Sequence, residues 1–487
     1  MKSVIQCFMI SMVLLSAAAK AQVAEKYEAS WPSLEKYQVP DWFRDAKFGI
    51  FIHWGVYSVP AYIGEWYPKQ MYTQGTKEFK HHVEKYGPQG KFGYKDFIPM
   101  FKGEKFDPDQ WAELFKKAGA KYVVPVAEHH DGFAMYKTSL SKWNAAEMGP
   151  KRDIIGELSK SIRKQNMIFG LSSHRIEHWW FLSGGRKFDS DVNDPKFADF
   201  YGPARGEEET MSPEFMNDWL LRSTELVDKY HPQLFWFDWW IEQPALNPYR
   251  KSFAAYYYNK AQEWNEGVVI NYKYDKAFPE KAAVLDLERG KLDEIRKLPW
   301  QTDDAIGNTS WGFTNDNTFK SAQYVITNLI DIVSKNGNLL LNIGPRPDGT
   351  ITDEETNVLL GTGKWLAING EAIYGTRPWK IAGEGPTQSA KGPFAEQKTP
   401  FNARDIRFTT KGDVLYAIGL GIPSGSTMIK SLGLTIENKT IGKVELLGST
   451  VPVSWKQTKN GLVIQPAGKY PAEYAVAYKI TFSEKSR

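Results

Sequence analysis

One carboxylate in this chain stands among aromatic residues in a way that suggests chemistry. Asp238 follows the apolar run Leu234-Phe-Trp-Phe237, and Trp239 and Trp240 come directly after it. The run predicts a short, fully buried strand that ends at Asp238. A charge in such a place is costly to bury unless something uses it. Asp238 is therefore a candidate catalytic carboxylate, and the alternative is a structural Asp that caps the next element or forms an ion pair.

Histidines end two other apolar runs. His53 closes the run 48–53, and His129 and His130 follow the run 122–127. Zinc sites on barrels usually use His-x-His or His-x-x-x-His pairs, which neither segment has. Adjacent residues of a strand point to opposite faces, so we expect His129 to face a pocket while His130 turns away, or the reverse. The spacing favours neutral imidazoles that bind hydroxyl groups over a metal site, and we expect no metal and no cofactor.

Hydrolysis of a glycosidic bond needs two carboxyl groups. One attacks the sugar or activates water, and the other protonates the leaving oxygen. The candidates at other strand ends are Glu65, Glu128, Glu177, Glu288 and Asp303. Glu288 is slightly favoured because it ends the strand-like run 284–289. Its neighbour Arg289 would tend to lower its pKa, whereas an acid needs a raised pKa. The alternative for Glu288 is a salt bridge with Arg289 or Lys291.

Alternating strands and helices must position these residues. The predicted strands are 48–53, 122–127, 168–173, 234–238, 268–272, 284–289, 300–304 and 339–343, and the predicted helices are 109–117, 153–164, 213–229, 252–264, 319–335 and 353–368. The alternation predicts parallel strands with helices outside, and eight strands predict a closed (β/α)8-like barrel with its site at the carboxyl ends of the strands. An open doubly wound sheet is the alternative, but residues 53–56 do not form the Gly-rich phosphate turn that usually follows its first strand.

Helical periodicity stops after about residue 377. The short strand-like runs 413–417, 443–447, 461–465 and 475–482 follow, with a hairpin signal at Asn460-Gly461. We therefore predict a catalytic domain over residues 22–376 and a C-terminal antiparallel β-sandwich over residues 377–487. The sandwich is expected to pack against the barrel rather than to bind glycan.

Residues 1–21 have the pattern of a secretory signal peptide: Lys2, an apolar stretch over 4–18 and the small-x-small end Ala19-Lys20-Ala21. Removing them takes away two lysines and the single cysteine, so the formal charge falls from +4 to +2. We expect an exported protein without disulfides, secreted or periplasmic, which is more typical of a bacterial periplasm than of an animal extracellular space. The near-neutral charge gives no case for nucleic acid, and no later run is long enough for a membrane span.

Six motifs in order resemble those of the α-L-fucosidases of glycoside hydrolase family 29. They are Lys47-Phe-Gly-Ile-Phe-Ile-His-Trp-Gly55, Glu65-Trp-Tyr67, Glu128-His-His-Asp-Gly-Phe133, Leu234-Phe-Trp-Phe-Asp238, Ser310-Trp-Gly-Phe313 and Asn342-Ile-Gly-Pro345. The resemblance spans roughly residues 40–375 and implies a (β/α)8-like domain followed by a β-sandwich. It also implies an exo-acting, retaining enzyme that removes terminal α-L-fucose from fucosylated oligosaccharides or glycoconjugates.

The resemblance assigns roles residue by residue. Asp238 matches the nucleophile, and Glu288 matches the acid/base of one subgroup. The residues that match fucose-binding or pocket-wall positions are His53, Glu65, Trp66, His129, His130 and Trp311.

Three departures from the family pattern concern the surroundings of the pocket. Glu128 stands where relatives often have Lys, the stretch 172–175 replaces a Tyr-rich turn, and Lys273 replaces an Arg. Lys is a point charge and cannot make the bidentate contact of Arg.

Two other functions fit parts of this pattern. A non-catalytic sugar-binding protein would keep the pocket but is expected to lose the nucleophile, and Asp238 is present. An exo-glycosidase that takes a fucose-like sugar such as L-galactose differs only in tolerating a hydroxyl on C6, and an apolar pocket near Trp311 would discriminate against it only modestly.

Overall fold

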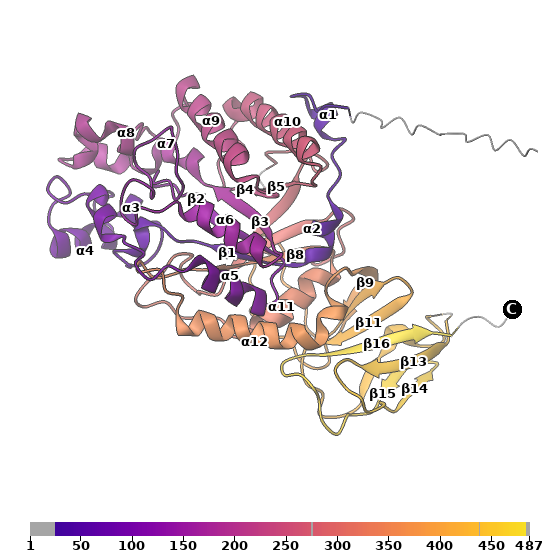
Figure 1. Cartoon of the computed structure of the whole chain (residues 1–487). Coiled ribbons are helices and arrows are strands. Elements are labelled where there is room, and N and C mark those ends of the chain that lie inside the picture. Colours follow the sequence, from indigo (N-terminus) through magenta and orange to yellow (C-terminus); the bar gives the residue numbers. More distant parts are fainter. Residues whose placement is uncertain (1–24, 274–275, 438, 484–487) are drawn as a thin grey trace, which may run out of the picture.

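The computed structural model describes residues 25–273, 276–437 and 439–483, and the predicted signal peptide lies outside these ranges. Eight parallel strands close into a barrel in which each strand pairs with the next and β8 pairs with β1 (Figure 1). The strands are β1 Phe48–Ile52, β2 Tyr122–Glu128, β3 Ile168–Ser173, β4 Leu234–Phe237, β5 Val269–Lys273, β6 Val284–Glu288, β7 Trp300–Ala305 and β8 Gly337–Ile343. The predicted barrel is confirmed, and the open-sheet alternative is wrong.

Helices surround the barrel strands, and several start at side-chain caps. Ser212 accepts a hydrogen bond from the Phe215 amide at the start of α9, and Thr352 does the same for the Glu355 amide at the start of α12. The helices are α1 Trp31–Leu34, α2 Asp41–Ala46, α3 Tyr67–Gln70, α4 Lys77–Tyr86, α5 Pro108–Lys117, α6 Ile154–Lys164, α7 His178–Phe181, α8 Ala198–Tyr201, α9 Pro213–Tyr230, α10 Asn247–Trp264, α11 Ala322–Ser334 and α12 Asp353–Asn369. Short 3-10 helices occur in the connections, among them η3 Arg175–Glu177.

Within the described residues, the connections before and after β6 contain no helix. They form turns and extended chain instead. A segment of the C-terminal region lies against the second of these connections, where Lys291 and Gly392 form an isolated antiparallel bridge. The chain after β6 is therefore covered by residues that lie about 100 positions later in the sequence.

The C-terminal region contains two antiparallel sheets. The five-stranded sheet has the order β13-β16-β11-β10-β9, and the three-stranded sheet has the order β12-β15-β14. The strands are β9 Arg377–Glu384, β10 Ile406–Lys411, β11 Val414–Gly419, β12 Thr427–Ile429, β13 Ile441–Leu446, β14 Trp455–Thr458, β15 Gly461–Ile464 and β16 Val476–Phe482. Leu415, Leu462 and Ile480 belong to one buried cluster that joins the two sheets. The predicted sandwich and its hairpin are confirmed, with Lys459 and Asn460 as the two connecting residues.

Helix α11 lies between the barrel and the C-terminal sheets, in contact with β8 on one side and with β9 and β10 on the other, and α12 packs against α11 and α5 (Figure 1). Trp365 on α12 is buried and donates a hydrogen bond to the Ala475 carbonyl at 2.9 Å. Arg407 on β10 reaches Asp331 on α11 at 2.6 Å. The sandwich is thus attached to the barrel through buried polar contacts as well as apolar packing.

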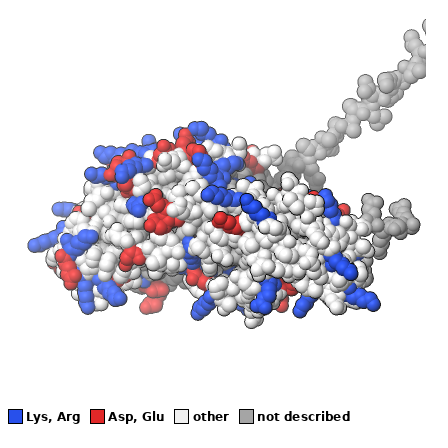
Figure 2. Space-filling model, turned by 90° about the horizontal axis from the view of Figure 1, so that it is seen from below, with Lys and Arg blue, Asp and Glu red and all other residues white. Residues whose placement is uncertain are grey.

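The surface carries charges of both signs. Figure 2 shows Lys and Arg side chains interspersed with Asp and Glu over one face of the molecule. Within the described ranges, no helix has the length and apolar character that a membrane crossing needs.

Candidate active site

The carboxyl ends of the barrel strands bring the predicted catalytic and binding residues to one opening. His53 and Asp238 directly follow β1 and β4, and Glu288 is the last residue of β6. His129 and His130 directly follow β2. This is the face on which barrel enzymes carry their active sites.

Asp238 is held by two imidazoles. Its Oδ2 lies 2.8 Å from His174 Nδ1 and 3.4 Å from His130 Nε2, and its side chain is 12% exposed. Burial alone would raise the pKa of this carboxyl, but His174, His130 and Lys273 outweigh it and hold the pKa well below its usual range. Asp238 is therefore ionised at neutral pH while one edge stays open to a ligand.

His174 fixes the orientation of this contact. Burial lowers its pKa to about 4 against the opposing effect of Asp238, so the ring is neutral at pH 7. Its Nε2 lies 3.0 Å from Ser172 Oγ. With Nδ1–H donated to Asp238, Nε2 accepts from the serine hydroxyl, which selects this tautomer.

Four imidazoles form one cluster in the opening. The ring centroid of His129 lies 4.3 Å from that of His130, 4.8 Å from that of His174 and 5.7 Å from that of His53. The expectation that His129 and His130 diverge is wrong, because β2 ends at Glu128 and the pleat no longer alternates beyond it. Burial lowers the pKa of His53 and His129 well below the usual range, so both rings are neutral and can bind hydroxyl groups.

His130 differs from its neighbours in charge. Its Nδ1 lies 3.3 Å from Glu177 Oε2, in addition to the contact with Asp238. Burial alone would lower its pKa, but the two carboxyl groups raise it to about 9. A protonated His130 beside Asp238 favours the ionised form of that carboxyl.

The cluster also has the geometry to gather around a metal ion, since ring nitrogens of His53, His129 and His174 come within 4.8 Å of one another. His174 uses both nitrogens for Ser172 and Asp238, and His53 Nδ1 lies 2.7 Å from Asn342 Oδ1. A metal ion on His174 would break one of these contacts. Hydroxyl groups of a ligand fit this cluster better than a metal ion does, because they can bind the ring nitrogens that are not already in contact with protein groups.

Glu288 has surroundings suited to a proton donor. Its Oε2 accepts a hydrogen bond from Trp239 Nε1 at 2.5 Å and lies 3.4 Å from Lys273 Nζ. Burial raises its pKa, and Asp303 and Asp238 add to the rise, while Lys273 opposes it. The Glu288 side chain is 14% exposed, so it is not sealed off from a substrate.

The suggested salt bridge of Glu288 with its sequence neighbours is wrong. Arg289 turns to Glu396 at 3.4 Å, and Lys291 lies 3.7 Å from Asp331. Arg289 was expected to lower the pKa of Glu288, but it turns away and the Glu288 pKa is raised.

Among the other carboxyl candidates, Glu177 contacts His130 in the opening at 3.3 Å and has a pKa that burial raises to about 8, whereas the rest are engaged elsewhere. Glu128 contacts Arg175 at 3.1 Å and Arg222 at 3.2 Å. Asp303 lies 2.8 Å from Lys273 and is almost fully buried. Of the candidates with a raised pKa, Glu288 has the most exposed side chain, at 14% against 6% for Glu177 and 2% for Asp303.

Glu65 holds the loop that carries Trp311. Its Oε2 accepts hydrogen bonds from Ser310 Oγ at 2.9 Å and from the amides of Trp311 at 3.0 Å and Gly312 at 3.3 Å. The Trp311 ring lies 5.3 Å from the ring of His53. Glu65 therefore sets the position of one pocket wall.

Trp66 forms a second wall. It immediately precedes α3 and is 36% exposed. Its ring lies 5.7 Å from His130 and 5.4 Å from Phe181. The opening thus has an aromatic ring beside His53 and another beside His130.

His174, Lys273 and Trp239 were not among the predicted site residues. His174 follows β3 and Lys273 ends β5, so the strand-end rule that selected Asp238 also points to them. Lys273 lies under the site, 2.8 Å from Asp303 and 4.5 Å from the Trp236 ring. No sequence signal indicated that Trp239 binds Glu288.

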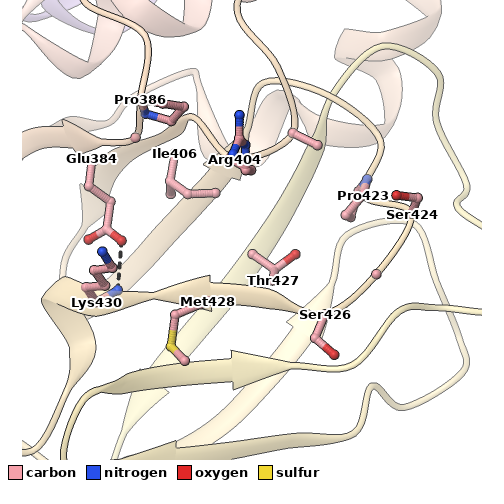
Figure 3. A pocket seen from close by; sticks show the side chains of 13 residues that line it. Glu384, Pro386, Arg404, Ile406, Pro423, Ser424, Ser426, Thr427, Met428 and Lys430 are labelled. Atoms are coloured by element: carbon pink, nitrogen blue, oxygen red, sulfur yellow. Dashed lines mark hydrogen bonds between the residues drawn. The ribbon is translucent and has the colours of Figure 1, made fainter.

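A separate hollow of about 800 Å³ lies within the C-terminal sandwich (Figure 3). Glu384, Arg404 and Lys430 lie along it, and Glu384 accepts a hydrogen bond from the Lys430 amide at 2.7 Å. None of its described lining residues belongs to the carboxyl and histidine cluster of the barrel.

Comparison with known proteins identifies the family. The Alpha-L-fucosidase family profile matches residues 14–371, and the Alpha-L-fucosidase C-terminal domain profile matches residues 398–481. The chain belongs to the α-L-fucosidase family. It is a glycoside hydrolase, so the alternative of a non-catalytic sugar-binding protein is wrong.

Similar proteins agree over nearly the whole length. Tissue α-L-fucosidase of Homo sapiens is 32% identical over 95% of this chain and 93% of its own. An α-fucosidase structure from Thermotoga maritima in complex with fucose is 32% identical with a TM-score of 0.74, covering 93% of this chain and all of that one. A second structure of the Thermotoga maritima α-fucosidase, with a mechanism-based inhibitor, is 31% identical with a TM-score of 0.75 over 94% of this chain and all of that one.

Proposed function

We propose that this protein is an exo-acting, retaining α-L-fucosidase that hydrolyses terminal α-L-fucose from fucosylated glycans through a covalent fucosyl-enzyme. The observation that carries the proposal is the pair Asp238 and Glu288. One carboxyl has a pKa held well below its usual range and the other has a raised pKa. Two carboxyl groups whose surroundings push their pKa values apart are typical of an acid and a nucleophile.

In the first step Asp238 attacks the anomeric carbon, and Glu288 gives its proton to the departing oxygen. The bond from fucose to the aglycone breaks, and an ester to Asp238 forms with inverted configuration. In the second step the Glu288 carboxylate takes a proton from water, which attacks the same carbon and releases Asp238. Two inversions give net retention.

Binding of the sugar is assigned to the other residues at the opening. The neutral rings of His53 and His129 offer nitrogens for fucose hydroxyl groups, and His129 Nδ1 has no protein partner within the described residues. Both nitrogens of His130 lie near protein carboxyl groups, so its charged ring borders the sugar site beside His129. Trp66 and Trp311 provide apolar walls, and Glu65 holds the Trp311 loop. A fucose-binding relative from Thermotoga maritima supports this choice of sugar.

The test is Asp238→Asn, compared with Asp316→Asn as a control at an exposed carboxyl. The Asp238 variant should lose hydrolysis of an aryl α-L-fucoside by at least about 10³-fold, as expected when a nucleophile is removed, with an unchanged circular dichroism spectrum. In the parent enzyme, 2-deoxy-2-fluoro-α-L-fucosyl fluoride should add one fluorofucosyl mass to the peptide that contains Asp238. Near-parental activity of the variant, or a label on another residue, contradicts the proposal.

A panel of α1,2-, α1,3-, α1,4- and α1,6-fucosylated oligosaccharides, with an aryl α-L-galactoside beside them, defines the substrate further. Faster hydrolysis of the L-galactoside than of the matching L-fucoside would favour the fucose-like alternative.

We also propose that the protein is exported. The support is the signal-peptide pattern of residues 1–21. Amino-terminal sequencing of the mature protein should begin at Gln22, and a mature chain that retains Met1 contradicts export by this signal.

A further inference from the structure

The connection between β9 and β10 leaves the sandwich and returns to the barrel beside Glu288. The amides and carbonyls of Gly392 and Lys291 exchange hydrogen bonds of 2.8 and 3.1 Å. The Phe394 amide donates to the Glu288 carbonyl at 2.8 Å. Residues 391–396, called here the returning segment, therefore bind directly to the end of β6.

Charges fix the returning segment in place. Glu396 lies 2.7 Å from Lys320 and 3.4 Å from Arg289. Arg289 also stacks over Trp311, with 4.9 Å from its guanidinium carbon to the ring centroid. The segment is thus tied to the same loop that forms a wall of the fucose pocket.

Phe394 is placed in an unusual way for a structural residue. Its side chain is 57% exposed, and its backbone has φ +53°, a conformation that costs a bulky L-residue about 1–2 kcal/mol. Its ring is nearly parallel to that of Trp239, with 10° between the planes and 6.2 Å between the centroids. Trp239 is the residue that donates a hydrogen bond to the Glu288 carboxyl.

Phe394 also lines a hollow that has room for a ligand, and neither Trp239 nor Glu288 is among its lining residues. The hollow measures about 450 Å³, and Asn308, Lys320 and Glu396 line it together with Phe394. Small-ligand sites usually measure about 300–1,000 Å³. Lys320, Glu396 and Lys398 are charged residues of its lining, and Phe394 and Tyr324 are the aromatic ones.

We propose that Phe394, supplied by the C-terminal region, forms with Trp239 the binding surface for the saccharide to which fucose is attached. This inference rests on the proposed function, since the leaving oxygen must lie at the carboxyl group of its acid. With Glu288 in that role, the group that departs lies beside Trp239 and Phe394. The apolar face of a pyranose stacks on aromatic rings, and hydroxyl groups at its rim can reach Lys320 and Glu396.

The experiment compares two substrates in Phe394→Ala. For the α-L-fucosyl disaccharide that the parent cleaves fastest, kcat/KM should fall about five- to tenfold, the loss expected for one stacked ring. For α-L-fucosyl fluoride, whose leaving group is fluoride instead of a saccharide, kcat/KM should fall much less. Phe394→Tyr should restore the disaccharide rate, and Val451→Ala, at an exposed apolar residue of the same region, should change neither substrate.

Transfer of fucose to an added acceptor sugar gives a second readout. The acceptor concentration for half-maximal transfer should rise in Phe394→Ala by the same factor as the loss on the disaccharide. Equal effects of Phe394→Ala on the disaccharide and on the fluoride overturn the proposal. An unchanged acceptor concentration for half-maximal transfer also overturns it, because the loss on the disaccharide would then come from a displaced Glu288 rather than from lost stacking. A parent enzyme that does not hydrolyse the fluoride overturns the proposed function instead.

Discussion

At the scale of single residues, burial acts on the two carboxyl groups with different results. Both are removed from water, which by itself raises the pKa of each. Asp238 contacts two imidazole rings and stays ionised. Glu288 shares the ammonium group of Lys273 with Asp303 and accepts a hydrogen bond from the indole of Trp239. The partners, rather than the depth of burial, separate a nucleophile from an acid.

Replacement of Glu288 tests the acid/base role. In Glu288→Ala the hydrolysis of fucosides with poor leaving groups should fall about 10²–10⁴-fold, because only they need the proton. Aryl fucosides with good leaving groups should form the fucosyl-enzyme at nearly the parental rate, and added azide should speed its breakdown. Because the variant lacks the Glu288 carboxyl with its raised pKa, its kcat/KM should no longer fall at alkaline pH.

The control for this prediction is Glu294→Ala, at an exposed carboxyl six residues further along the chain. It should keep the parental leaving-group dependence and the parental pH profile. Equal losses of Glu288→Ala on good and poor leaving groups would assign the acid to another residue, with Glu177 as the first alternative because burial raises its pKa to about 8.

His174 is predicted to keep the nucleophile ionised. His174→Phe keeps a ring against Trp236, which lies 5.1 Å away, but removes the donor to Asp238. A hydrogen bond to a charged group contributes about 1.5–3 kcal/mol, so activity should fall about 10- to 100-fold. The Asp238 pKa rises, and the acid limb of kcat/KM therefore moves to higher pH.

His231→Phe, at an exposed ring that stacks on Trp264, serves as the matched control and should leave the pH profile in place. If the acid limb of His174→Phe stays where it is in the parent while activity falls, the contact with Asp238 does not set its ionisation.

At the scale of elements, most barrel strands could be predicted because they are apolar runs with a polar residue at or near the end, whereas β7, which contains Gln301, Thr302, Asp303 and Asp304, had the weakest pattern. All eight were found, and Asp238 was placed correctly at the end of the fourth. Four strands of the sandwich, β9, β10, β12 and β14, were not predicted, and for two of them the structure shows a physical reason. In β9 most residues are half-exposed and Pro378 interrupts the pattern, and in β10 the alternation is broken by Arg407, which is buried because it binds Asp331.

The same limit applies to the site. Strand ends predict which residues reach the opening, so His53, His129 and Glu288 could be named from the sequence. They do not predict contacts made by loops, because these depend on how distant segments fold back. The hydrogen bonds of Glu65 to residues 310–312 cross 245 positions or more, and the contact of Trp239 with Glu288 joins the connection after β4 to the end of β6.

At the scale of the whole molecule, one buried carboxylate joins the barrel to the sandwich. Asp331 on α11 is fully buried and binds Lys335 at 2.8 Å, Arg407 of β10 at 2.6 Å and Ser389 Oγ at 2.9 Å. Lys335, Arg407 and Lys291 outweigh the effect of burial and hold the Asp331 pKa well below its usual range. Each of these cations would be left buried without its anion if Asp331 were neutral.

Asp331→Asn should therefore lower the free energy of unfolding by about 3–5 kcal/mol, as is usual when one member of a buried ion pair is removed. Asp41→Asn is the matched control, because its ion pair with Arg44 at 3.3 Å is exposed and such pairs contribute about 0–1 kcal/mol. Urea unfolding followed by tryptophan fluorescence measures both. Equal stability of Asp331→Asn and the parent would show that apolar packing alone holds the two parts together.

The stability difference between parent and Asp331→Asn should depend on pH. A carboxyl whose folded pKa lies below its unfolded value of about 3.9 contributes its full stabilisation above that pH. The contribution is lost as the pH falls from there towards the folded pKa. The difference should therefore be constant between pH 5 and 7 and shrink below about pH 4. A difference that persists undiminished at the lowest pH where both proteins fold would mean that the variant acts through packing rather than through charge.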